Sequence, residues 1–176
     1  MKTIASANKT QLTVRRIAIS ALFAALIFCG TYFIKIPMPF AEGYIHAGDG
    51  FVFLAAVILP APYAAAAAAI GAGLSDLIGG YPLWIPATIG VRVIAVLFFS
   101  RRGKVFCRRH LIALAASAAV NVIGYWLYES AVVYQNLVGG LAAMPFNLAQ
   151  SVVGIILFLA LAKPARSVVE RTLGEI

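Results

Sequence analysis

The feature that most constrains this chain is a series of long apolar runs without a charged residue. One run covers residues 17–34 and another covers residues 50–75. A helix needs about 20 consecutive apolar residues to cross a bilayer. Hydrophobic residues make up 62% of the 176 residues and charged residues only 11%, which excludes a disordered chain and an ordinary soluble domain. The sequence therefore predicts a polytopic all-α membrane protein, with one domain over residues 1–176.

Prolines and basic residues determine the number of membrane crossings. Pro60 and Pro62 interrupt the run 50–75 and favour two helices there. Twelve of the fourteen Lys and Arg residues lie in three clusters: before residue 17, within 101–109, and after Ala162. Because positively charged loops face the cytoplasm, an even number of crossings must separate these clusters. Two helices within the 50–75 run satisfy this parity.

We therefore expect six transmembrane helices, with the N and C termini both cytoplasmic. The second helix is too short to span alone, so it should extend into the preceding loop or lie buried among its neighbours. Residues 35–49 contain two prolines and two glycines, which argue against a helix there. The expected helices cover about residues 17–34, 49–59, 62–78, 86–100, 111–128 and 144–162.

The remaining polar side chains gather on the outer side of this topology. Ionisable groups in a membrane are costly, and a one-sided cluster resembles a pocket open to the outside more than a path across the membrane. Arg92 is the deepest charge, about 9 Å into its helix at 1.5 Å per residue. It needs an acidic partner, for which Asp49 and Asp76 are candidates. Arg92 ties helices together, anchors a ligand, or does both with different atoms of its guanidinium.

Pairs of polar residues on shared helix faces are further candidates for ligand contact. Tyr125 and Glu129 are four residues apart, and Asn147 and Gln150 are three apart. If both faces point inward, they offer donors and acceptors suited to a small heterocycle. The alternative is that these groups form hydrogen bonds between helices.

Three other residues have either a structural role or a role in ligand contact. His46 is either a structural histidine or a ligand contact, and Tyr81 and Trp84 either stack on a ring or belong to an interfacial aromatic belt. The predicted ligand-binding set is His46, Asp49, Tyr81, Trp84, Arg92, Tyr125, Glu129, Asn147 and Gln150.

Signals for enzymatic activity are weak. The chain has no H-E-x-x-H and no G-x-S-x-G motif, and Ser75 with His46 is a conceivable but unsupported catalytic pair. No phosphate-binding P-loop motif occurs, so ATP-driven transport would need another subunit. No soluble module is left to bind nucleic acid. We predict no enzymatic activity, cofactor, metal site or nucleic-acid partner.

Several stretches, taken in order, resemble a known family. They are His46-Ala-Gly-Asp-Gly50, Leu59-Pro-Ala-Pro-Tyr63, the segment 70–82, Pro86-Ala-Thr88 leading to Arg92, Gly124-Tyr125 with Glu129, and the segment 145–150. The chain resembles, over nearly its whole length, the S component of an energy-coupling factor (ECF) vitamin transporter. The likeness is to the riboflavin-type branch, which also includes proposed hydroxymethylpyrimidine and pyridoxine carriers.

This chain departs from the family pattern at two places. Family members often have Leu-Gly-Pro where this chain has Leu59-Pro-Ala-Pro62, and they often have lysine at the position of Arg92. Arginine presents a rigid fork of donors rather than a point charge, so the ligand cannot be copied from a relative.

The resemblance implies a multi-pass subunit of a prokaryotic cytoplasmic membrane that captures a vitamin outside. It would then topple and release the ligand inside, when docked on a transmembrane coupling subunit driven by two ATPases. Docking in the family uses an A-x-x-x-A surface on the first helix, which Ala21 and Ala25 match. The alternative for these alanines is internal packing.

We therefore expect the substrate-binding subunit of an ECF importer, with the segment 35–48 as an outer lid. The expected ligand resembles vitamin B6 or hydroxymethylpyrimidine, and riboflavin is the alternative. Alternative functions from other classes remain: a small intramembrane enzyme, a membrane assembly factor or a self-sufficient transporter.

Overall fold

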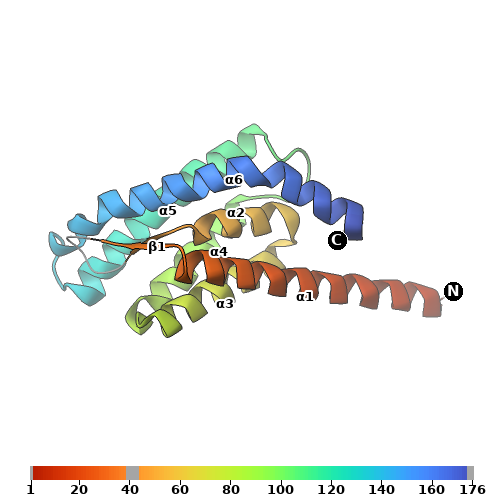
Figure 1. Cartoon of the computed structure of the whole chain (residues 1–176), viewed down its shortest axis with the longest axis horizontal. Coiled ribbons are helices and arrows are strands. Elements are labelled where there is room, and N and C mark those ends of the chain that lie inside the picture. Colours follow the sequence, from red (N-terminus) through yellow and green to blue (C-terminus); the bar gives the residue numbers. More distant parts are fainter. Residues whose placement is uncertain (1, 39–43, 174–176) are drawn as a thin grey trace.

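The computed structural model describes residues 2–38 and 44–173 as a bundle of six helices with a small hairpin at one end (Figure 1). The expected all-α membrane fold is confirmed. The helices are α1 (Lys2–Tyr32), α2 (Gly48–Ile58), α3 (Ala61–Gly79), α4 (Ile85–Phe98), α5 (Arg108–Tyr128) and α6 (Met144–Leu173). Shorter elements are the strands β1 (Lys35–Pro37) and β2 (Tyr44–His46), the 3₁₀ turns η1 (Pro82–Trp84) and η3 (Gly139–Ala143), and the π-helical turn η2 (Glu129–Val133).

Within residues 2–38 and 44–173, four helical stretches are long and apolar enough to cross a membrane, namely Thr10–Tyr32, Ala61–Gly79, Arg108–Val133 and Gly139–Arg171. Two shorter apolar stretches, Gly48–Ile58 and Pro82–Phe98, complete the bundle. The shortest helix, α2, is buried at every residue except Phe51, which is half-buried. Burial among its neighbours, one of the two expected solutions for this helix, is the one observed.

The start of α1 and the end of α6 lie at the same end of the molecule, and the hairpin lies at the opposite end (Figure 1). This arrangement agrees with an even number of crossings between the basic clusters. We refer to the hairpin end as the outer end, in keeping with the expected cytoplasmic position of the basic clusters.

Small residues let the helices approach closely. A side chain at Gly71 of α3 would overlap the backbone carbonyl oxygen of Ala24 in α1 and would also press on Ile27. Ala64, Ala67, Ala68 and Ala72 of α3 are buried. The alanine-rich stretch thus serves close helix packing, as small residues do in membrane proteins.

Several bounds differ from the sequence expectation. α1 begins at Lys2 rather than near 17, and α6 continues through Pro164 to Leu173 rather than ending near 162. Hydropathy marks where a helix leaves the apolar layer, and a polar helix can continue beyond that point. Within the expected outer loop, β1 pairs with β2 in antiparallel register, with Lys35 opposite His46. The residues 39–43 of the expected lid lie outside the described residues.

Candidate functional site

A polar cavity lies at the outer end of the bundle, beneath the hairpin, and offers about 40 Å³ of internal space. Space of this size holds one or a few water molecules and is far smaller than a typical ligand pocket of about 300–1,000 Å³. The described residues that line it are Met38, Tyr44, His46, Asp76, Tyr81, Trp84, Thr88, Tyr125, Glu129, Asn147 and Gln150.

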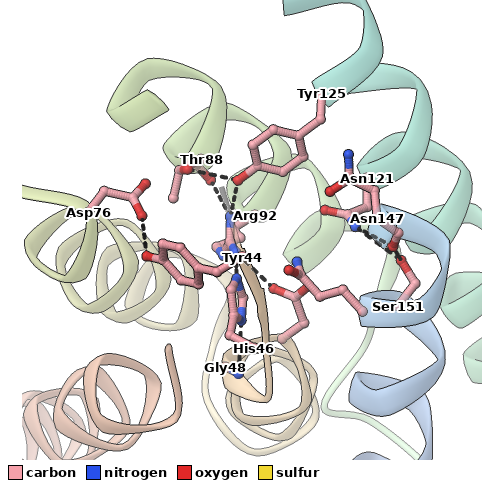
Figure 2. Close-up of polar contacts among 12 residues, drawn as sticks. Tyr44, His46, Gly48, Asp76, Thr88, Arg92, Asn121, Tyr125, Asn147 and Ser151 are labelled. Atoms are coloured by element: carbon pink, nitrogen blue, oxygen red, sulfur yellow. Dashed lines mark hydrogen bonds and ion pairs between the residues drawn. The ribbon is translucent and has the colours of Figure 1, made fainter. Parts of the chain in front are cut away.

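Arg92 of α4 lies behind this cavity and joins three other elements (Figure 2). Its Nη2 atom lies 3.2 Å from Asp49 Oδ1 in α2 and 2.8 Å from His46 Nε2 in β2. Its Nη1 atom donates to Tyr125 Oη in α5 at 2.8 Å. The side chain is only 2% exposed, so these groups replace water around the charge. The acidic partner of Arg92 is Asp49 rather than Asp76.

Asp49 is held from two sides. Besides Arg92, its Oδ2 atom accepts a hydrogen bond from Gln150 Nε2 in α6 at 2.8 Å. Both carboxylate oxygens are therefore engaged, as a buried charge requires. This network connects α2, α4 and α6 beneath the cavity and fixes the positions of these helices relative to one another.

His46 fits this network as a neutral ring. A guanidinium only donates, so contact with Arg92 requires His46 Nε2 to accept. Gly48 N lies 3.1 Å from Nδ1, and a neutral imidazole accepts at one nitrogen only, so one of the two contacts is a hydrogen bond in a given tautomer. Burial lowers the pKa of His46 to about 4, with Asp49 partly opposing and Arg92 reinforcing the shift.

Tyr44 connects the hairpin to α3. Its hydroxyl donates to Asp76 Oδ1 at 3.0 Å (Figure 2). Burial, together with the neighbouring Asp76 carboxylate, raises the pKa of the Tyr44 hydroxyl above its ordinary value. The phenol therefore stays protonated and remains a donor to Asp76.

Aromatic rings form one wall of the cavity. The ring of Tyr81 makes edge contacts with Tyr44 and Trp84 at centroid distances of 5.0 and 5.7 Å. Trp84 Nε1 also donates to Glu129 Oε1 at 3.3 Å. These contacts orient the rings beside two carboxylates, those of Asp76 and Glu129, an arrangement suited to a flat ring that carries hydrogen-bond donors.

Two buried polar atoms in the lining residues lack partners. Among the residues that the structure describes, none hydrogen-bonds to Asp76 Oδ2 or Asn147 Nδ2. The backbone of Asn147 is nevertheless fixed, because its carbonyl oxygen accepts from Asn121 Nδ2 at 3.1 Å and Ser151 Oγ at 2.9 Å. Buried polar groups are normally satisfied, so one free acceptor and one free donor are available for a bound molecule.

Seven of the nine predicted site residues line the cavity: His46, Tyr81, Trp84, Tyr125, Glu129, Asn147 and Gln150. Asp49 and Arg92 do not line it and support it from behind instead. The predicted set omitted Met38, Tyr44, Asp76 and Thr88. Asp76 was identifiable as a costly charge near an outer helix end, and Tyr44 as a polar aromatic in the outer segment. Met38 and Thr88 carry no such signal.

Ala21 and Ala25 lie away from the cavity, exposed on α1. With Ala24, Ala66 and Ala67 they line an apolar groove of about 720 Å³ between α1 and α3. Both side chains are open to a neighbour from outside the chain.

Six apolar helices around a polar cavity at one end define a polytopic membrane protein with a buried polar site. Residues 11–167 match the family model described as "ECF-type riboflavin transporter, S component". The chain belongs to this family of ECF transporter S components. The family consists of substrate-binding transporter components and is not an enzyme family, and membership associates the chain with an ECF transporter.

One curated relative is similar over most of the chain. A protein of Pyrococcus woesei, named "Uncharacterized protein in gap 3'region", is 32% identical over 130 residues, which are 72% of this chain and 85% of the relative. The name of this relative specifies no ligand.

Proposed function

We propose that this protein captures a small water-soluble vitamin or vitamin precursor outside the cell, as the high-affinity substrate-binding subunit of an ECF-type importer. The observation that carries the proposal is the cavity in which the buried Asp76 Oδ2 and Asn147 Nδ2 have no hydrogen-bond partner among the described residues. Membership of the S-component family supports the same role. The small volume of the cavity implies that the hairpin side must move outward before a ligand enters.

The charges around the cavity favour an uncharged or weakly basic ring as the ligand. Asp76 and Glu129 line it, whereas none of its described lining residues is Lys or Arg. Arg92, the nearest buried cation, is already paired with Asp49. A phosphate or carboxylate on the ligand would meet the like charges of Asp76 and Glu129. Lys35 lies over the ring of Tyr44 at 5.2 Å, but it is exposed to solvent and does not line the cavity. A molecule like vitamin B6 or hydroxymethylpyrimidine fits this environment, and riboflavin, which the family description names, is the alternative.

Energy for uptake would come from partner subunits. The chain has no P-loop motif, so we infer a transmembrane coupling subunit and two ATPase subunits. The exposed Ala21 and Ala25 and the groove beside them offer a flat strip for a helix of the coupling subunit. Multi-pass insertion in a prokaryotic cytoplasmic membrane follows from this role.

An enzymatic role has less support. The conceivable pair was Ser75 with His46, but the two ring nitrogens of His46 face Arg92 and the backbone nitrogen of Gly48. A general base needs a free nitrogen within hydrogen-bond reach of the nucleophile. We therefore favour a binding subunit over a hydrolase.

The test is calorimetric titration of the purified protein in detergent with pyridoxine, hydroxymethylpyrimidine, riboflavin and pyridoxal phosphate. We expect one uncharged ligand to bind with a micromolar or lower Kd and pyridoxal phosphate to bind at least about 100-fold more weakly, a difference of about 2.7 kcal/mol. Tight binding of the phosphorylated compound would contradict the charge argument. Saturable binding of none of them would contradict the vitamin assignment.

Two variants locate the site. Asn147→Ala and Glu129→Ala should each weaken binding about tenfold, since a lost hydrogen bond to a ligand is worth about 1 kcal/mol and one to a charged group more. The matched controls are Asn136→Ala in the exposed outer loop and Glu170→Ala near the end of α6. Unchanged affinity in both pocket variants would exclude this cavity as the binding site.

A further inference from the structure

A second groove lies at the opposite end of the bundle, where α4 ends and α5 begins. It has a volume of about 390 Å³. Its lining residues are Phe98, Arg108, Arg109, Ile112, Ala113 and Ala116. None of these residues lines the outer cavity or the groove beside Ala21 and Ala25.

The groove is basic at its mouth. Arg108 and Arg109 are exposed and stand at the end of the cluster 101–109, which holds five Lys and Arg residues. Among the described residues, the ion pairs are Arg92 with Asp49 and Arg166 with Glu170, so neither Arg108 nor Arg109 has an acidic partner. The positive charge of these arginines therefore favours a bound molecule that carries negative charge.

Below the arginines the groove becomes apolar. Arg108, Ile112 and Ala116 are spaced four residues apart and so lie along one face of α5. The eight helical steps from Arg108 to Ala116 span about 12 Å along the helix axis. Phe98 of α4 forms the opposite wall, and Ala116 is small enough to leave the groove open. An acyl chain of several methylene groups matches this length and this lining.

The chain holds the basic mouth in place. Arg166 Nη1 in α6 donates to the carbonyl oxygen of Gly103 at 2.9 Å. The Nε2 atom of the buried His110 lies 2.8 Å from the carbonyl oxygen of Ser100. Arg109 Nη2 is 3.5 Å from the carbonyl oxygen of Phe99. These contacts tie the loop 99–107 to α5 and α6, and Arg108 and Arg109 are held at the groove because they are the first two residues of α5.

We propose that this groove binds a membrane lipid with an anionic phosphate headgroup, in the leaflet that faces the termini. The phosphate lies between Arg108 and Arg109, and one acyl chain follows Phe98, Ile112 and Ala116 into the bilayer. Basic residues beside a transmembrane helix attract anionic lipids near the membrane surface. The apolar groove beneath them distinguishes a lipid from free phosphate, which would use the charges alone.

The test is native mass spectrometry of the full chain, released from micelles that contain equal amounts of phosphatidylglycerol and phosphatidylcholine. We expect one retained phosphatidylglycerol and a preference of at least about tenfold over phosphatidylcholine, equivalent to about 1.4 kcal/mol. Arg108→Gln/Arg109→Gln should abolish the preference. The control Arg101→Gln/Arg102→Gln removes the same charge from residues that do not line the groove, and should retain it.

A third variant separates lipid from free phosphate. Ala116→Phe fills the apolar part of the groove and leaves both arginines in place, so it should lower phosphatidylglycerol retention. If the double variant does not fold, Arg108→Gln alone should lower the preference, because the Arg108 side chain makes no hydrogen bond or ion pair with the described residues. Equal retention of both lipids by the wild type, equal losses in the two double variants, or displacement of the lipid by millimolar inorganic phosphate would each overturn the proposal.

Discussion

Arg92 lies deep enough in the bundle that protein groups must satisfy its charge. The two terminal nitrogens of its guanidinium contact different elements. Nη2 lies near Asp49 and His46. Nη1 donates to Tyr125 and, at 3.3 Å, to the carbonyl oxygen of Thr88. A lysine ammonium is a single point and cannot reach both sides in the same way. The residue thus holds four elements in register beneath the cavity, which is the structural reading of the two that the sequence offered.

Replacing Arg92 with Met should destabilise the protein by about 3–5 kcal/mol, because Asp49 would remain as a buried unpaired charge. The double variant Arg92→Met/Asp49→Asn should regain much of this loss, since asparagine is uncharged and still accepts from Gln150. Denaturation of the three proteins in mixed micelles measures both effects. A single variant as stable as the wild type would show that the pair is not the organising contact.

His46 makes stability depend on pH. Its pKa is lowered to about 4 in the folded state, whereas the ordinary value is about 6.5. Between these values the unfolded chain binds a proton that the folded chain does not, so stability falls as pH falls from about 6.5 to 4. The loss at pH 4 is on the order of 3 kcal/mol. Unfolding measured at pH 7 and pH 4.5 should show a smaller pH effect in His46→Gln, and an identical effect would contradict this assignment.

The need of Arg92 for a partner follows from the sequence, because an unpaired buried charge is costly. The choice of Asp49 over Asp76 does not, because both lie near outer helix ends and the decision depends on helix rotation. Similarly, the four-residue spacing of Tyr125 and Glu129 predicted a shared face but not its direction, and in the structure both side chains line the cavity. Thr88 and Met38 could not be found, since uncharged residues of these types occur throughout apolar helices.

At the scale of elements, the number and order of helices follow from hydropathy and charge parity, whereas several bounds do not. The hairpin of β1 and β2 replaces an expected loop, because its pairing depends on contacts with the bundle end: Ala47 N, just after β2, donates to the carbonyl oxygen of Gly30 in α1 at 3.1 Å. The turn η2 extends α5 through Glu129 into an expected loop. Neither feature has a local sequence pattern.

Close contact between α1 and α3 should depend on Gly71. Gly71→Leu places a side chain where Ala24 and Ile27 lie, so the helices must separate, at a cost of about 1–3 kcal/mol or more. The matched control is Gly90→Leu in α4, because a Cβ atom there has no neighbour within 4 Å. Thermal unfolding in detergent compares the two. Equal behaviour of both variants would mean that the alanine-rich interface does not require the glycine.

At the scale of the whole molecule, the polar cavity lies at one end and the groove lined by Arg108 and Arg109 at the other. The hairpin covers the polar end and is bonded to α3 through Tyr44 and Asp76. Only about 40 Å³ of space lies beneath it among the described residues. Binding of a vitamin-sized molecule therefore requires displacement of the hairpin, the lining side chains, or both.

Tyr44→Phe should loosen this cover. The variant keeps the ring that contacts Tyr81 and removes the hydroxyl that donates to Asp76, a bond to a charged group worth about 1.5–3 kcal/mol. Ligand exchange measured by stopped-flow quenching of Trp fluorescence should become about tenfold faster in both directions. Tyr63→Phe, on α3 beside Arg16, is the control and should leave the rates unchanged. Unaltered exchange in Tyr44→Phe would argue against the hairpin as the lid.

The most direct test of the central claim is native mass spectrometry of the protein purified gently from its host, followed by denaturing release of any bound small molecule. The account predicts one molecule per chain, with a mass in the range of a vitamin or its precursor and without a phosphate or carboxylate group. The same molecule should be lost from Asn147→Ala/Glu129→Ala. A folded protein that carries no such molecule and shows no thermal shift across a panel of vitamins would contradict the account.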